Sequence, residues 1–86
     1  MKKVLMMVQQ GCLHCRRAFE LMDQLSKENP QYAQVSVKIV DELQEKEFAD
    51  ALDYWYVPTY FVDGQKVHEG VPSLEKIQAV FEAALS

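Results

Sequence analysis

The stretch VQQGCLHCRRAF, from Val8 to Phe19, contains the only two cysteines of the chain, three positions apart. An apolar run ends at Val8 and a helical pattern follows Cys12, so we expect Cys12 to lie where a strand ends and a helix begins. A CxxC pair at such a junction has three interpretations: a redox pair, a metal-binding pair or two inert thiols.

The composition describes one small globular domain, which we place at residues 1–86. An apolar fraction of 49% over 86 residues is ordinary for a globular protein and argues against disorder. The net charge of −4 gives no reason to expect a nucleic-acid partner, because phosphate binding needs clustered lysines and arginines. We expect no membrane partner either, since no segment approaches the ~20 apolar residues that span a bilayer. We expect a monomer.

The first residues, MKKVLMMVQQG at positions 1–11, imitate a secretory signal with two lysines before an apolar run. That run, Val4 to Val8, is shorter than the ~7–15 residues of a signal core, and a buried strand explains it better. We therefore expect a cytoplasmic protein, where disulfides do not persist as passive crosslinks. In that compartment a CxxC pair is more often catalytic or metal-binding than structural.

The first half of the chain predicts a strand, a helix and a second strand. Residues 3–8 form a near-continuous apolar run, as in a central strand covered on both faces. A helical pattern then runs from Leu13 to about Glu28 and ends before Pro30, because proline cannot continue a helix. The alternating apolar residues at 35, 37 and 39 predict the second strand. The inward positions expected on the helix are Ala18, Leu21, Met22 and Leu25, with Phe19 at the edge.

The second half predicts a helix, a hairpin and a last helix. Asp41 is expected to cap the first of these helices, and Ser73 the last. The stretch TYFVDGQKVHE, residues 59–69, predicts a β-hairpin, because Asp63-Gly64 favours a type I′ turn with positive φ at both positions. The positions expected to face inward are Leu43, Phe48, Ala51 and Leu52 on the first helix, and Leu74, Ile77, Val80, Phe81, Ala84 and Leu85 on the last.

These elements predict one α/β fold with the order βαβαββα. Two opening strands joined by a helical crossover should be parallel, with a right-handed connection. The hairpin then extends the sheet with antiparallel strands. We therefore predict a four-stranded mixed sheet with helices on both faces.

The two cysteines should play different roles. At Cys12, the unpaired N–H groups and the positive end of the helix dipole would stabilise a thiolate. Cys15 lies one turn further, with the Cα atoms ~5–6 Å apart, a distance that a disulfide can span. We expect Cys12 to face solvent and attack as the nucleophile, and Cys15 to be shielded and to act as the resolving thiol.

Positive charge surrounds the pair. His14 lies between the cysteines, and Arg16 and Arg17 follow at once. Positive charge near the thiolate stabilises the reduced form, so we expect His14 and Arg16 to tune the redox potential. The alternative for all three is a solvated helix face without a role in the chemistry.

A second motif is YVPTYFVDG at residues 56–64. Together with GCLHC after the apolar strand, it resembles the thioredoxin superfamily, particularly its small glutaredoxin-like members. The resemblance covers Lys3 to Leu85 and implies a thioredoxin-like fold and thiol–disulfide oxidoreductase activity. It also implies that Pro58 is cis, packs against the CxxC pair and keeps metals off the thiols. From the residues alone, a trans proline opening an edge strand is the alternative.

The resemblance assigns a substrate-binding surface. It implies that the Val57 backbone pairs with a substrate chain, with Tyr56 beside it and Gly70 at the position of a glutathione subsite. The segment Glu69–Leu74 keeps Gly70 and a helix start able to attract a carboxylate, but lacks the second glycine and acidic pair of glutaredoxins. We expect no bound cofactor. The expected substrate is a disulfide-containing protein or a low-molecular-weight thiol, with glutathione as a candidate co-substrate.

The chain departs from the family around the cysteines as well. Thioredoxins carry Trp-Cys-Gly-Pro-Cys with a buried acid in the preceding strand, whereas this chain has GCLHC and no acid from Val4 to Val8. Tyr54, Trp55 and Tyr56 lie next to the site, where aromatic side chains could dock a protein substrate. We expect Trp55 to be partly buried under the sheet edge and His68 to be a plain surface residue.

Two other functions remain open. A copper or zinc carrier with a CxxC pair would have the order βαββαβ, ending on a strand, whereas the last pattern here has a helical period. A non-catalytic thioredoxin-like binding module would keep the fold and leave the cysteines without a role.

Overall fold

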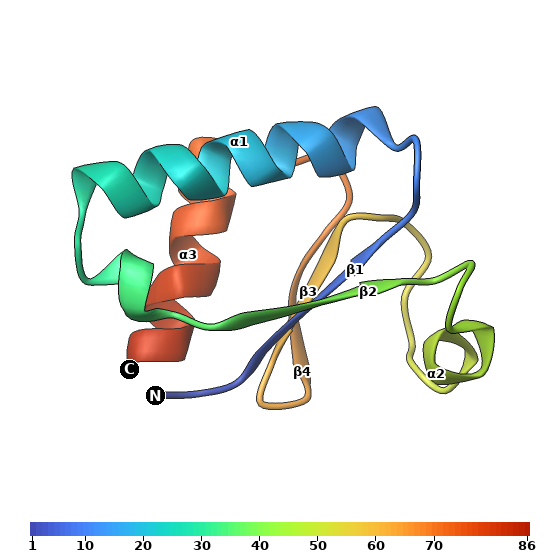
Figure 1. Cartoon of the computed structure of the whole chain (residues 1–86). Helices are drawn as coiled ribbons and strands as arrows, with labels where there is room; N and C mark the ends of the chain where they lie inside the picture. Colours follow the sequence, from blue (N-terminus) through green and yellow to red (C-terminus); the bar gives the residue numbers. More distant parts are fainter.

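The chain folds in the predicted order βαβαββα, and the computed structural model describes all residues from 1 to 86 (Figure 1). A short 3-10 helix, η1 (Tyr32–Gln34), is the one element that the pattern did not predict. The other elements are β1 (Val4–Val8), α1 (Leu13–Glu28), β2 (Val37–Asp41), α2 (Lys46–Asp50), β3 (Thr59–Val62), β4 (Gln65–Glu69) and α3 (Leu74–Leu85).

The four strands form one mixed sheet in the order β2-β1-β3-β4. β1 runs parallel to β2 and antiparallel to β3, which pairs antiparallel with β4. The hairpin turn has φ of 48° at Asp63 and 84° at Gly64, as a type I′ turn requires. Because β3 lies between β1 and β4, it is an inner strand, and Pro58 does not precede an edge strand.

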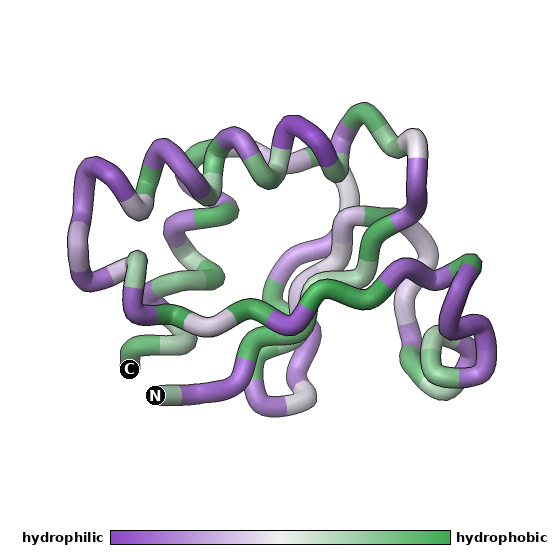
Figure 2. The backbone as a smooth tube through the Cα atoms, in the orientation of Figure 1, coloured by the Kyte–Doolittle hydropathy of each residue, from purple (hydrophilic) through white to green (hydrophobic).

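The helices cover both faces of the sheet, as predicted. α1 and α3 lie on one side in Figure 1 and close the larger core, which includes Met6 and Tyr60 from the sheet. α2 lies on the other side, where Ala49 joins a smaller cluster with Met7 and Phe61. In Figure 2, β1 is largely hydrophobic while α1 alternates between hydrophobic and hydrophilic, as expected for a buried strand and a half-covered helix. No helix here has both the length and the apolar character needed to cross a membrane.

The long helices begin and end where the sequence predicts. The Ser73 hydroxyl accepts a hydrogen bond from the Lys76 N–H at 3.2 Å and caps α3. α1 ends at Glu28, and its C-cap Asn29, directly before Pro30, donates its N–H to the Leu25 carbonyl at 2.9 Å. All the residues predicted to face inward on these two helices are buried or half-buried except Leu74, which is 37% exposed.

The second helix differs from its prediction. Asp41 does not cap it: its Oδ1 accepts from the Leu43 N–H at 2.8 Å and its Oδ2 from the Gln10 N–H at 3.1 Å. The chain therefore turns first, and α2 begins only after Glu45, which makes no side-chain cap. Ala49 is its buried residue. Of the positions predicted to face inward, Leu52 is half-buried while Leu43, Phe48 and Ala51 are exposed.

The second strand begins two residues later than its alternation suggests. β2 starts at Val37, and Val35 ends η1 instead. β2 is also an edge strand of the sheet, which leaves Ile39 about half exposed on the side that α1 and α3 cover elsewhere.

Candidate active site

The turn between β1 and α1 brings Cys12 to the start of the helix. Gly11 has φ of +82°, a conformation that favours glycine, and it reverses the chain after β1. The Cys12 N–H donates to the Gln9 carbonyl at 3.1 Å, and Cys12 then serves as the N-cap of α1 in an extended conformation. The strand-to-helix junction predicted for the cysteine pair is therefore present.

The Cys12 sulfur lies among backbone groups of two segments. Its Sγ accepts a hydrogen bond from the Cys15 N–H at 3.1 Å, which is the N-cap interaction of α1. Its thiol also faces the Val57 carbonyl at 3.9 Å. The Cys12 sulfur is thus a hydrogen-bond acceptor at a helix start, with a backbone N–H directed at it.

Cys15 has a different environment. Both thiols are free, but Cys12 is half-buried whereas Cys15 is only 3% exposed and belongs to the larger core. Burial, together with the hydrogen bond to Cys12, raises the pKa of the Cys15 thiol to about 12. At neutral pH Cys15 therefore carries its proton.

The loop before β3 completes the surroundings of the cysteine pair. The Val57–Pro58 bond is cis, as the resemblance implies. Pro58 is buried, and its carbonyl accepts from the Gly70 N–H at 2.9 Å, so the start of the last loop lies against it. Gly70 has φ of +92°. The structure thus brings Cys12, Val57, Pro58 and Gly70 to one place from three distant parts of the chain.

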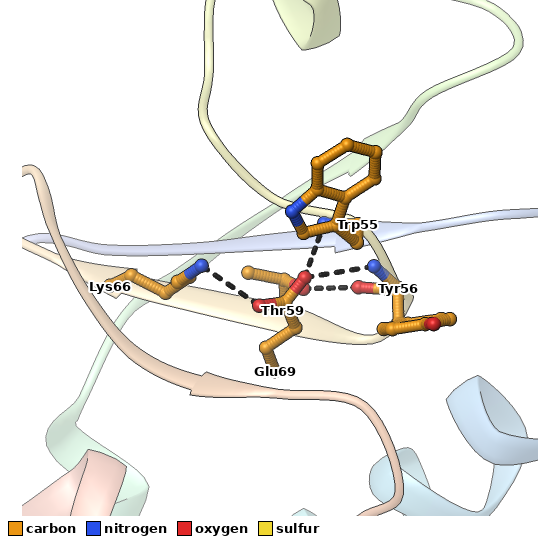
Figure 3. A network of polar contacts seen from close by, with 5 residues as sticks. All are labelled: Trp55, Tyr56, Thr59, Lys66 and Glu69. Atoms are coloured by element: carbon orange, nitrogen blue, oxygen red, sulfur yellow. Dashed lines mark hydrogen bonds and ion pairs between the residues drawn. The ribbon is translucent and has the colours of Figure 1, made fainter.

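Glu69 holds the segment before the cis proline, a contact that the sequence did not reveal (Figure 3). Its Oε2 accepts from the backbone N–H groups of Trp55 and Tyr56, the latter at 2.9 Å, and its Oε1 from the Lys66 ammonium at 2.8 Å. The hydroxyl of Thr59 donates to the Tyr56 carbonyl in the same network. The Lys66 bond and the two N–H bonds hold the pKa of the Glu69 carboxyl at about 2.

Two aromatic side chains stand out from this held segment. Trp55 is 83% exposed and Tyr56 is 69% exposed, so the expectation that Trp55 is partly buried is wrong. The backbone N–H of Trp55 donates to the Glu69 carboxylate, and Figure 3 shows the indole ring directed away from the carboxylate network. Tyr54 instead packs inward, donating its hydroxyl to Glu42 at 2.6 Å.

The charged residues near the pair remain in solvent. His14, Arg16 and Arg17 are exposed, and Arg17 pairs with Glu20 at 3.2 Å. Arg16 makes no ion pair; it lines a hollow of about 440 Å³ beside Cys12 and Cys15. A cation is therefore present next to the cysteine pair.

His68 is buried, so the expectation of a plain surface residue is wrong. It lies opposite Tyr60 in the β3–β4 pairing, with the two ring centroids 6.2 Å apart. Its Nε2 lies 3.1 Å from the Gly70 carbonyl oxygen. Burial lowers the pKa of His68 below its usual range.

No group of three or more His, Cys, Asp or Glu side chains is arranged to hold a metal ion. His14 is the nearest histidine in sequence to the cysteines, and His68 is turned into the core. The donor set at the site thus consists of two thiols.

Comparisons with known proteins agree with this fold. The family model described as a thioredoxin domain matches residues 2–82. Among solved structures, a thioredoxin from Malassezia sympodialis has a TM-score of 0.73 at 22% identity, covering 99% of this chain and 76% of that one. A malarial protein has a TM-score of 0.73 at 18% identity, covering 100% of this chain and 99% of the other. A designed protein has a TM-score of 0.65 at 19% identity, covering 99% and 73%. A search among curated sequences found no significant match.

Proposed function

Because this chain belongs to the thioredoxin-domain family, we propose that it is a thiol–disulfide oxidoreductase acting through Cys12 and Cys15. The observation that carries the proposal is the unequal environment of the two thiols. Cys12 receives an N–H bond at the helix start, while the pKa of the buried Cys15 is raised to about 12. One sulfur is thus arranged to attack and the other to wait as a thiol.

The proposed reaction reduces a substrate disulfide in two exchanges. The Cys12 thiolate attacks one substrate sulfur, the substrate S–S bond breaks, and the departing sulfur takes up a proton. Cys15 then attacks the Cys12 sulfur while its proton passes to the departing substrate sulfur; the Cys12–substrate S–S bond breaks, and the second substrate sulfur leaves as a thiol. Two electrons have passed to the substrate, and the protein carries a Cys12–Cys15 disulfide that an external dithiol or thiol must reduce.

The substrate-binding surface lies around the cis proline. The Val57 backbone is proposed to pair with an extended segment of the substrate, with Tyr56, Pro58 and Gly70 beside it. Support comes from the 3.9 Å approach of the Cys12 thiol to the Val57 carbonyl, which places the backbone beside the reacting sulfur. His14 and Arg16 are proposed to tune the redox potential, because exposed positive groups beside a thiolate favour the reduced pair.

The proposed substrates are disulfide-containing proteins or low-molecular-weight thiols, with glutathione as a candidate co-substrate. By its resemblance to glutaredoxins, Gly70 is proposed to lie in a glutathione subsite. We further propose a cytoplasmic monomer without a nucleic-acid partner. The net charge of −4 supports the last point.

Reduction of insulin disulfides tests the nucleophile. The wild-type protein should accelerate the reaction, and the Cys12→Ser variant should fall to the uncatalysed rate, because the hydroxyl is not a nucleophile at neutral pH. Far-ultraviolet circular dichroism of the variant checks that the fold is retained. Equal rates for the folded variant and the wild type would overturn the assignment.

A CxxC metal carrier is the main alternative, and two observations weigh against it. The chain ends on α3, whereas the βαββαβ carriers end on a strand. The pKa of about 12 at Cys15 makes its thiolate, the form that binds metal, costly to produce. Zinc and copper measured on freshly purified protein separate the two functions. The insulin assay distinguishes the oxidoreductase from a non-catalytic binding module, which would not accelerate the reaction.

A further inference from the structure

The sheet face opposite α1 and α3 is only partly covered. α2, the helix on that face, has five residues, and beside it a cavity of about 490 Å³ opens. Its apolar walls include Leu5 and Phe61 from the sheet, and Phe48 and Leu52 from α2 and the residues after it. The volume lies in the range of small-ligand pockets, ~300–1,000 Å³.

This cavity is separate from the cysteine pair. Its lining includes residues 1–5, at the beginning of β1, whereas Cys12 follows the other end of that strand. A strand of five residues spans about 16 Å. The cavity therefore has no part in the proposed thiol chemistry.

Positive charge gathers around the cavity. Lys2, Lys3 and Lys38 line it, and none of them forms an ion pair. The Lys38 ammonium lies 5.4 Å from the centre of the Phe48 ring, directly at the apolar wall. Asp63 is the only acidic residue in the lining, and its Oδ1 already accepts from the Lys3 backbone N–H at 2.9 Å. Three unpaired lysines in a chain of net charge −4 are a local concentration of positive charge.

The backbone around these lysines is held in place. The Lys2 N–H donates to the Ala84 carbonyl at 2.9 Å, and the Asp63 N–H donates to the Lys3 carbonyl at 2.9 Å. The beginning of the chain is thus attached to both α3 and the hairpin. The rim of the cavity exists before a ligand arrives, which reduces the ordering that binding requires.

We propose that this cavity binds a small amphipathic anion, namely a medium-chain aliphatic carboxylate taken up as a free monomer. The alkyl chain lies against Leu5, Phe48 and Phe61, and the carboxylate faces Lys38 and its neighbours. An apolar neutral ligand would gain no attraction from the three exposed lysines. A plain inorganic anion would leave the apolar walls wet, so only a ligand with both parts matches the lining.

Three probes with ten-carbon alkyl chains, each below its micelle concentration or solubility limit, test the charge requirement. Decanoate should cause saturable chemical-shift changes in the amide spectrum of the full chain, concentrated at residues 2–5, 38 and 48–52. Decanol should bind more weakly, and decyltrimethylammonium should not bind. Decanol binding as tightly as decanoate would overturn the proposal, as would shift changes centred on Cys12.

A matched pair of variants tests the site. Lys38→Gln should weaken decanoate binding about two- to fivefold, because one partly exposed charge is removed from the rim. Lys46→Gln makes the same change on α2 outside the cavity lining and should bind like the wild type. Both variants should reduce insulin like the wild type. Equal affinities of the two variants would refute the site.

Two further measurements distinguish a free carboxylate in the cavity from a membrane surface or a second copy of the chain. Vesicles carrying anionic lipid should not sediment the protein; cosedimentation that decanoate cannot compete with would point to a membrane surface and overturn the proposal. Sedimentation velocity at the titration concentrations should give the mass of one chain. A dimer that dissociates on Lys38→Gln would show that a second copy covers this face, which also overturns the proposal.

Discussion

At the scale of single residues, the difference between the two cysteines follows from local chain geometry. An N-cap side chain accepts from an N–H of the first turn, and Cys12 accepts from Cys15 at 3.1 Å. The residue three positions on then points toward the covered side of the helix, where Cys15 is buried. Both placements could be predicted from the sequence, because they depend on one helix start and its spacing.

Cys15→Ser should trap the intermediate of the proposed exchange. Without a resolving thiol, Cys12 stays joined to the substrate as a mixed disulfide. Mass spectrometry of the variant incubated with oxidised protein substrate, without added reductant, should show adducts on Cys12. The matched Cys12→Ser variant should show none. A Cys15→Ser protein without adducts would contradict the resolving role of Cys15.

Glu69 is the residue of the site that the sequence did not reveal. Nothing in a lone acid at the end of a hairpin indicates that it will accept two backbone N–H groups from a segment 13 and 14 positions earlier. The pairing depends on β4 lying beside the loop before β3. Such long-range contacts follow from the sheet order and not from any local pattern.

Glu69→Gln should weaken the binding of protein substrates more than the binding of small ones. The amide has one acceptor oxygen without charge, so the Trp55–Tyr56 segment is held less firmly beside the site. We expect the KM for a protein disulfide to rise about two- to fivefold with little change in kcat. The rate with a small aromatic disulfide should stay unchanged. Glu75→Gln, an exposed acid in the first turn of α3, is the control. Equal losses on both substrates would argue for a general structural role.

At the scale of the elements, the two long helices were predictable from the sequence and the short helix was not. α1 and α3 each bury a stripe of apolar side chains over three or more turns. The helical spacing of these residues can be recognised from the sequence alone. α2 has five residues and one buried side chain, Ala49, so tertiary contacts decide where it lies. Asp41 could cap a helix or a turn; here its carboxylate bonds Leu43 and Gln10. The Gln10 contact depends on β2 pairing with β1, which the local pattern does not contain.

Ser73→Ala should destabilise the fold through α3. The Ser73 hydroxyl satisfies the Lys76 N–H at the helix start, and removal of such a cap lowers the free energy of unfolding by about 1 kcal/mol. For a domain of this size the melting temperature should fall by roughly 4–8 °C. Ser36→Ala, at an exposed position outside any helix, should leave the melting temperature unchanged. A shift of the same size in both variants would rule out capping as the cause.

At the scale of the whole molecule, α1 and α3 share one core with the two inner strands, β1 and β3. His68 shows why burial on an edge strand is hard to predict. Alternation predicts that one side of β4 is covered but not how far α3 extends over it. The register sets His68 opposite the fully buried Tyr60, and α3 contacts both strands, β3 and β4. The His68 side chain is therefore buried beside Tyr60, which belongs to the larger core that includes Cys15.

His68 should make the stability of the protein depend on pH near neutrality. Burial is the largest cause and lowers its pKa in the folded state; the hydrogen bond to the Gly70 carbonyl and the Glu69 charge oppose this shift, and Lys76 adds to it. The unfolded state therefore binds the proton more readily. Above the unfolded pKa of about 6.5 neither state is protonated and the full stability is present. As the pH falls below that value toward the folded pKa, the free energy of unfolding decreases.

Urea denaturation at a series of pH values between 5 and 8 measures this dependence. The wild type should lose stability on the acidic side, and His68→Gln, which removes the titrating imidazole, should lose less. His14→Gln replaces an exposed imidazole and should keep the wild-type slope. The contribution of Glu69 falls in a different pH range. With a folded pKa of about 2, its stabilisation of the fold is complete above pH 4.5 and is lost only as the pH falls toward 2. An identical slope in wild type and His68→Gln between pH 5 and 7 would show that another group carries the dependence.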